Sequence, residues 1–422
     1  MLTPECKSQK GSCLSRGSVW SSSFNLTKAT LGAGVLSLPL AARGTGIPLV
    51  LVLLIFCAIM THLSIGMLGK ACDIQKLYTY DELSSKLFGK FLSILVGIAM
   101  FVNCFGSAVV YVLVLGSISK AVFALDSTWS QVVVTCGLLT PLNCLPDINA
   151  LRYFSFTGVL GVMLLTVATV YSAVIKATPF DTGMLIPNTQ NPLAFVSAFS
   201  TITFAFTNQY NVPNLYGGLK NQTVSTMKKV SIRSVIMSFV VYATAGITGY
   251  MAFKTSLGKA ESGEPKNTLI ELFGEMAKWG SGGHWLVVIA VIGCAVSVSV
   301  AHPLLLFPVR QSMDVMIGEW LPSQKGNKWI SAGFGACLSL MTLGVALLFP
   351  NVGSIIDLVG SFAGSMICYI CPSVFLLMIA KENGEKIWSG KFGLHHFMWA
   401  FGTLIGIGGT AISIYTAVVE SK

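Results

Sequence analysis

The sequence predicts an all-α polytopic membrane protein with eleven transmembrane helices. Of its 422 residues, 53% are hydrophobic and only 10% are charged, whereas a soluble domain has roughly 25% charged residues. The mean hydropathy is +0.73. Apolar stretches of about 20 residues, long enough to cross a bilayer, recur along the whole chain. These observations exclude most soluble enzymes, nucleic-acid-binding proteins and secreted disulfide-rich scaffolds.

The predicted spans follow a short N-terminal tail of residues 1–21. The first span is not a cleaved signal peptide, because its apolar run begins late and is interrupted by glycines. The largest loop contains an amphipathic stretch, Thr268–Trp279, which predicts a helix on the outer membrane surface. The spans are residues 22–42, 47–69, 91–119, 128–146, 154–176, 192–218, 232–253, 285–309, 329–349, 353–380 and 396–418.

The distribution of basic residues predicts the orientation. With the N-terminus in the cytoplasm, the inner segments hold 18 Lys and Arg residues and the outer segments hold 8. Cytoplasmic loops carry such an excess, so we expect a cytoplasmic N-terminus. The net charge of +10 is spread through short loops and does not indicate nucleic acid as a partner. The cysteines lie mostly inside apolar spans, so no disulfide framework is expected, and the pair Cys368 and Cys371 is interpreted as structural.

The first span is interrupted by small residues. Gly32, Ala33 and Gly34, followed by Pro39, weaken a helix in the middle of the membrane. An opened helix exposes N–H and C=O groups that hydrocarbon cannot satisfy unless they line a polar cavity. A close contact between two helices through these small residues is an equally consistent interpretation.

The sixth span is too polar for a lipid-facing helix, and Pro213 prevents its regular continuation. Interrupted spans in corresponding halves of the chain indicate the midplane site of a transporter built from inverted repeats. The N–H groups of opened half-helices suit a carboxylate, and unwound carbonyls suit an ammonium group. An α-amino acid carries both. The polar residues of the sixth span form one stripe along it, and they are Ser197, Ser200, Thr201, Thr207, Asn208 and Asn211.

Four motifs together resemble the amino acid/auxin permease family. They are Phe24-Asn-Leu followed by Gly32–Pro39, then Tyr80–Gly89, Pro303–Arg310, and Ile355–Gly360 followed by Pro372. The resemblance covers nearly the whole chain. It implies a LeuT-type 5+5 inverted repeat, with residues 22–176 and 192–380 as the two repeats, helices 1 and 6 broken, and 396–418 as an accessory helix. It also implies secondary active transport of amino acids.

The resemblance also implies a substrate site. The backbone around Gly32, Ala33 and Gly34 would hold the substrate carboxylate, with Thr30 nearby. Polar residues from the third span and the break of the sixth would bind the amine and shape the side-chain pocket. For the tyrosine among them, a satisfied core residue is an equally consistent interpretation. These further residues are Ser107, Tyr111, Phe204, Thr207 and Asn208.

The sequence departs from the sodium-coupled members of that family at two positions. Those members carry Asn where this chain has Lys28 and Thr near Ala301. Two oxygen ligands are lost and an ammonium group is gained, so proton coupling or exchange is expected rather than sodium symport. An intramembrane charge is by default a functional residue, although Lys28 could also snorkel toward the interface.

Three more polar residues accompany Lys28 in the predicted ion-coupling set. Ser297 and Ser299 are the remaining oxygens of the eighth span. His302 could titrate during transport, but a core histidine is the favoured interpretation. Asp357 is a candidate gate on the outer path, and a pairing with an unidentified donor explains it equally well.

The sequence therefore predicts an amino acid transporter, with neutral substrates favoured over arginine or lysine because no acidic residue lies deep in the spans that line the site. The alternative is an amino acid sensor that binds its ligand and transports little. We expect no enzymatic activity and no cofactor. The plasma membrane is the favoured location, with a vacuolar or lysosomal membrane as the alternative. The sequence does not predict an oligomeric state.

Overall fold

The computed structural model describes residues 17–145, 149–176, 193–254, 268–273, 284–320 and 327–420, and the single residues 184 and 276. All regular secondary structure in these ranges is helical, which confirms the predicted class. Eight helical stretches in them are long and apolar enough to cross a membrane: Ile47–Gln75, Tyr80–Phe123, Gly158–Ile175, Val224–Phe253, Trp285–Gln311, Lys328–Leu348, Val352–Glu382 and Gly390–Thr416.

The three other predicted spans are each divided into shorter segments, so the total of eleven stays a prediction. The first consists of α1 (Val19–Thr30), the 3₁₀ turn η1 (Ala33–Ser37) and α2 (Leu38–Thr45). The fourth consists of α5 (Ser127–Val134), the π-helical turn η2 (Thr135–Leu139) and α6 (Thr140–Asn143). The sixth consists of α8 (Leu193–Phe206), the 3₁₀ turn η4 (Gln209–Asn211) and α9 (Val212–Gly217).

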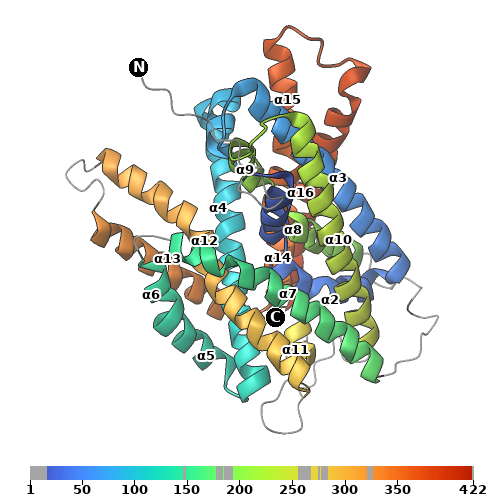
Figure 1. Ribbon diagram of the computed structural model, residues 1–422, viewed down its shortest axis with the longest axis vertical. Helices are drawn as coiled ribbons and strands as arrows, with labels where there is room; N and C mark the ends of the chain where they lie inside the picture. Colours follow the sequence, from blue (N-terminus) through green and yellow to red (C-terminus); the bar gives the residue numbers. More distant parts are fainter. Residues whose placement is uncertain are drawn as a thin grey trace, which may run out of the picture.

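Long helices surround these interrupted ones. Helix α8 lies in the middle of the bundle, with α3 and α10 on one side and α12 and α13 on the other (Figure 1). The tenth predicted span contains two consecutive π-helical turns, η7 and η8, between α14 and α15. The bounds are α3 Ile47–Gln75, α4 Tyr80–Phe123, α7 Asn149–Lys176, α10 Val224–Phe253, α12 Trp285–Trp320, α13 Lys328–Leu348, α14 Val352–Val359, η7 Gly360–Gly364, η8 Met366–Ile370, α15 Cys371–Glu382 and α16 Gly393–Glu420.

Helix α4 begins eleven residues before the predicted span. The Thr79 side chain caps its first turn by accepting a hydrogen bond from the Glu82 N–H, as serine and threonine do at helix N-termini. Gly89 then adopts a φ of 72°, a conformation that glycine tolerates best, and the helix kinks there. The motif Tyr80–Gly89, which falls between the second and third predicted spans, is therefore a helix joined to the membrane span.

The expected surface helix at Thr268–Trp279 is wrong in its described part. In the described part of this stretch, helix α11 covers Leu269–Phe273, and its apolar side chains are buried in the protein. The Phe273 ring lies 5.6 Å from the Phe253 ring at the end of α10. An amphipathic sequence pattern shows how wide the apolar face of a helix is, but it does not show whether the membrane or the rest of the protein covers that face.

Candidate functional site

The predicted interruption of the first span is present. Helix α1 ends at Thr30, Leu31 is extended, and Gly32 has φ −137° and ψ −151° before η1 begins. The Leu31 N–H still bonds to the Thr27 carbonyl at 2.8 Å. The carbonyls of the residues that follow Thr27 do not continue the helical hydrogen-bond pattern. The last carbonyls of a helix need partners from outside it.

The sixth span is interrupted where the family resemblance implied, a few residues before Pro213. Helix α8 ends at Phe206, and Asn208 has φ −138° and ψ 0°. Pro213 instead occupies the first turn of α9, where proline is well tolerated because that N–H has no helical partner. The break therefore falls within Thr207 and Asn208, two of the predicted substrate-binding residues.

The two interrupted helices meet each other. Asn208 Nδ2 donates a hydrogen bond to Thr30 Oγ1. A Cβ atom added to Gly34 would lie 2.6 Å from the Ala205 Cα, so only glycine permits this approach of η1 to α8. The structure thus brings three of the predicted substrate-binding residues into one junction.

Tyr242 of α10 completes this junction and was not predicted. Its hydroxyl lies 2.6 Å from the Thr30 carbonyl oxygen and 2.7 Å from that of Ala205, so it bonds to the ends of both α1 and α8. The side chain is fully buried, with its ring 5.2 Å from that of Phe206. A tyrosine in an apolar helix has no local signal of such a role, because a core tyrosine has the same sequence pattern.

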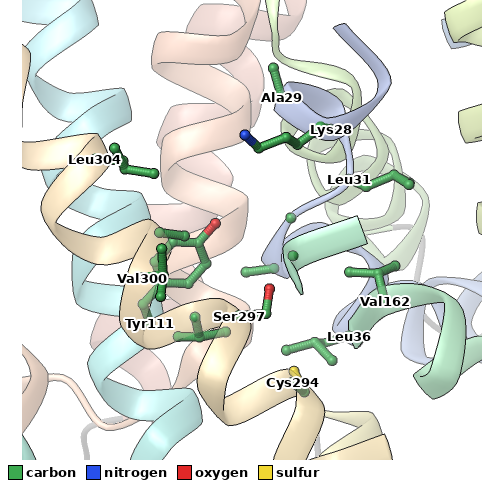
Figure 2. A pocket seen from close by; sticks show the side chains of 15 residues that line it. Lys28, Ala29, Leu31, Leu36, Tyr111, Val162, Cys294, Ser297, Val300 and Leu304 are labelled. Carbon is green, nitrogen blue, oxygen red and sulfur yellow. The ribbon is translucent and has the colours of Figure 1, made fainter. Parts of the chain in front are cut away.

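A pocket of about 90 Å³ opens at the α1 break. It lies between the end of α1, α4, α7 and α12, and Figure 2 shows the polar ends of Lys28, Tyr111 and Ser297 around a common space. The remaining lining is mostly aliphatic. Of the predicted site residues, the pocket contains Lys28, Gly32, Ala33, Tyr111 and Ser297.

Tyr111 reaches the break of α1 from the third predicted span. A Cβ atom at Gly32 would lie 3.2 Å from the Tyr111 hydroxyl, so the hydroxyl is next to the opened backbone. Ser107, one turn earlier on α4, is also buried but does not line the pocket.

Two predicted residues of the sixth span, Phe204 and Thr207, lie against the π-helical turns and not in the pocket. Thr207 Oγ1 donates to the Thr203 carbonyl at 2.7 Å and lies 3.3 Å from Cys368 Sγ. The Cys368 thiol in turn donates to Gln209 Oε1 at 3.0 Å. Phe204 packs against Gly360, where a Cβ atom would lie 2.9 Å from the Phe204 Cβ.

The predicted ion-coupling residues are separated. Ser299 Oγ donates to the Ala295 carbonyl of its own helix at 2.8 Å and does not line the pocket. His302 is fully buried, with Nδ1 3.0 Å from Asn143 Nδ2 and Nε2 3.3 Å from Thr342 Oγ1. An amide NH₂ group only donates, so Nδ1 accepts and Nε2 carries the proton. These contacts favour a core histidine.

Asp357 on α14 contacts α8. Its carboxylate accepts hydrogen bonds from the hydroxyls of Ser197 and Thr201, the latter at 2.6 Å. These two hydroxyls are donors that the sequence analysis had left unidentified. Because Thr201 lies six residues before Thr207, or about 9 Å of helix rise, the carboxylate is well removed from the α8 break.

Two interrupted helices that meet beside a pocket in a bundle of membrane-spanning helices define a polytopic membrane protein of the transporter type. The chain belongs to the transmembrane amino acid transporter family, whose sequence profile matches residues 15–417. This confirms the resemblance inferred from the motifs.

Several relatives are similar over most of the chain. The *Schizosaccharomyces pombe* vacuolar amino acid transporter 5 is 24% identical over 413 residues, 95% of this chain and 94% of the relative. The *Arabidopsis thaliana* amino acid transporter AVT6E is 23% identical over 426 residues, 96% of this chain and 84% of the relative. Human solute carrier family 38 member 10 is 25% identical over 388 residues, 86% of this chain but 32% of the relative. The chain thus spans about a third of the length of this last protein.

Proposed function

We propose that this protein is a secondary active amino acid transporter that alternates access around the α1 and α8 breaks, and that it uses protons or exchange rather than sodium. The two repeats, residues 22–176 and 192–380, would supply one broken helix each. The observation that carries the proposal is the pocket at the α1 break, because it contains an ammonium group where a coupling cation would otherwise sit.

The contents of this pocket argue against sodium. Lys28 lines it from α1, and Ser297 and Ala301 line it from α12. Lys28 would repel a cation, and the Ala301 side chain has no oxygen to coordinate one. The Lys28 side chain is half-buried, and a lysine ammonium that exchanges a proton performs the task of a coupling ion in this proposal, since the protonation of lysine responds readily to desolvation.

The position of Asp357 supports neutral amino acids as the proposed substrate class. Cationic amino acids need an acidic partner for their side chains, and Asp357 was the nearest candidate. Its carboxylate already accepts hydrogen bonds from Ser197 and Thr201, about two turns of α8 away from the break. Neutral amino acids therefore suit the junction of Thr30 and Asn208, with the opened backbone of Gly32 and Ala33, which line the pocket, proposed to bind the carboxylate.

Uptake of labelled amino acids into proteoliposomes tests the proposal. We expect saturable uptake of neutral amino acids, stimulated by an inward proton gradient and equal in sodium and potassium. Lys28→Met should abolish the stimulation by the gradient, whereas Lys229→Met, at an exposed position of α10, should preserve it. Sodium-dependent uptake would contradict the coupling mechanism. Binding without uptake would instead favour the sensor.

A further inference from the structure

The junction of the two interrupted helices is a place where oxygen atoms converge. Thr30 is the last residue of α1, Ala205 is the penultimate residue of α8, and their carbonyl oxygens point at one atom, the Tyr242 hydroxyl. Both carbonyls lie at helix C-termini, which carry the negative end of the helix dipole. Two such ends directed at one point favour a positive charge there.

A third oxygen lies beside the same junction without a partner. Asn208 is 1% exposed, and its Nδ2 donates to the Thr30 hydroxyl, whereas its Oδ1 has no hydrogen-bond partner among the residues that the structure describes. A buried polar atom with no partner destabilises the folded state unless a ligand or water satisfies it. Carbonyl oxygens of this kind coordinate cations in unwound membrane helices.

We infer that the Tyr242 hydroxyl occupies the position of a monovalent cation at this junction and thereby excludes sodium from it. A phenol proton supplies a partial positive charge to the two carbonyls and fills the space between them. The exclusion is independent of Lys28, because Tyr242 lies on α10 and does not line the Lys28 pocket. The inference deepens the proposed sodium-independent transport and rests on it.

The variant Tyr242→Phe tests this role. Phenylalanine keeps the ring that packs against Phe206 and removes only the hydroxyl, leaving the carbonyls of Thr30 and Ala205 to a cation and water. We expect the variant to transport poorly in potassium and to be stimulated by sodium by about threefold or more, a factor typical of one hydrogen bond. The wild type should be equally active in both salts.

Thermal unfolding in detergent gives a second measurement that does not depend on transport. A bound ion stabilises the folded state, so the melting temperature of Tyr242→Phe should be higher in sodium than in potassium by on the order of 2 °C. The wild type should show no such difference. Tyr250→Phe is the matched control, because Tyr250 is buried on the same helix, about 12 Å along it.

The outcomes separate this inference from the proposed function. If the wild type transports without sodium and Tyr242→Phe responds equally to sodium and potassium in both measurements, the role of Tyr242 is overturned. A sodium-specific stabilisation of the wild type would also overturn it, even if the variant did not fold. Sodium-driven uptake by the wild type would contradict the proposed coupling instead, whatever the variant does.

Discussion

Asn208, at the break of α8, donates a hydrogen bond to the hydroxyl of Thr30, the last residue of α1. The two residues are 178 positions apart in the sequence, and the bond joins the two interrupted helices at their open ends. Thr30 also donates from the same hydroxyl to the Leu26 carbonyl at 2.8 Å. One side chain therefore closes the end of α1 and fixes its distance from α8.

Thr30→Val should weaken substrate binding more than it slows transport. Valine keeps the branched shape of threonine but removes the hydroxyl, so Asn208 loses its acceptor and the open ends of α1 and α8 lose their side-chain connection. The loss of one hydrogen bond is worth about 0.5–1.5 kcal/mol, so the KM for a neutral amino acid should rise roughly two- to tenfold.

Thr45→Val is the control for that measurement. Thr45 is also buried, but among the described residues its hydroxyl bonds to the Ala41 and Gly46 carbonyls at the end of α2 and not to another helix. The KM of Thr45→Val for the same neutral amino acid should equal that of the wild type. An unchanged KM in Thr30→Val would show that the hydroxyl does not support the substrate site.

Gly34→Ala should abolish transport without preventing membrane insertion. The added methyl group would lie 2.6 Å from the Ala205 Cα and Cβ atoms, so η1 would have to move away from α8. Overpacking of this kind costs typically 1–3 kcal/mol. Uptake normalised to the amount of protein in the membrane is the measurement. Gly344→Ala on α13 is the control, because no atom lies within 4 Å of a Cβ there, and it should transport normally.

The parts of the fold that local sequence determines were predictable. Long apolar runs identified the membrane-spanning helices, and small residues at Gly32–Gly34 identified the break of α1. The family resemblance placed the break of α8 at Phe204, Thr207 and Asn208, and the structure confirms it there, whereas the residues taken alone pointed only to Pro213 as the end of regular helix. The actual break at Thr207 and Asn208 depends on tertiary hydrogen bonds, among them the bond from Asn208 to Thr30.

The contacts that cross the bundle were not predictable. Tyr242 and Ala205 are 37 residues apart, and Tyr242 and Thr30 are 212 apart, so no spacing in the sequence relates them. The donors to Asp357 were missed for the same reason, although Ser197 and Thr201 belonged to the polar stripe already identified. Periodicity gives the face on which a residue lies but not the helix that covers this face.

Asp357→Asn should destabilise the protein without making it selective against cationic substrates. Asparagine keeps one oxygen acceptor and loses the other along with the negative charge, so either Ser197 or Thr201 loses its carboxylate acceptor. Hydrogen bonds to a charged group contribute about 1.5–3 kcal/mol, and the melting temperature should fall accordingly. The ratio of arginine to neutral amino acid uptake should stay as it is in the wild type.

The control for Asp357→Asn is Glu82→Gln, because Glu82 is exposed. This variant should change neither the melting temperature nor the ratio of arginine to neutral amino acid uptake. If Asp357 contacted the side chain of a cationic substrate, Asp357→Asn would lose arginine uptake and keep neutral uptake. That result would reverse the substrate class proposed here.

His302→Gln should lower the stability of the protein and leave its response to the proton gradient intact. His302 joins α12 to Asn143 of α6 and to Thr342 of α13, and Arg310 donates to the Asn143 and Leu145 carbonyls in the same region. Removing one partner from a buried network costs about 1–3 kcal/mol, so the melting temperature should fall.

A double-mutant cycle with Asn143 separates a structural contact from proton coupling at His302. If their hydrogen bond is what the single variants lose, His302→Gln and Asn143→Ala together should destabilise less than the sum of the two. The stimulation of uptake by the proton gradient, expressed as a ratio, should equal that of the wild type in all three variants. Loss of this ratio in His302→Gln alone would instead identify His302 as a carrier of the coupling proton, a role its contacts with Asn143 and Thr342 do not favour.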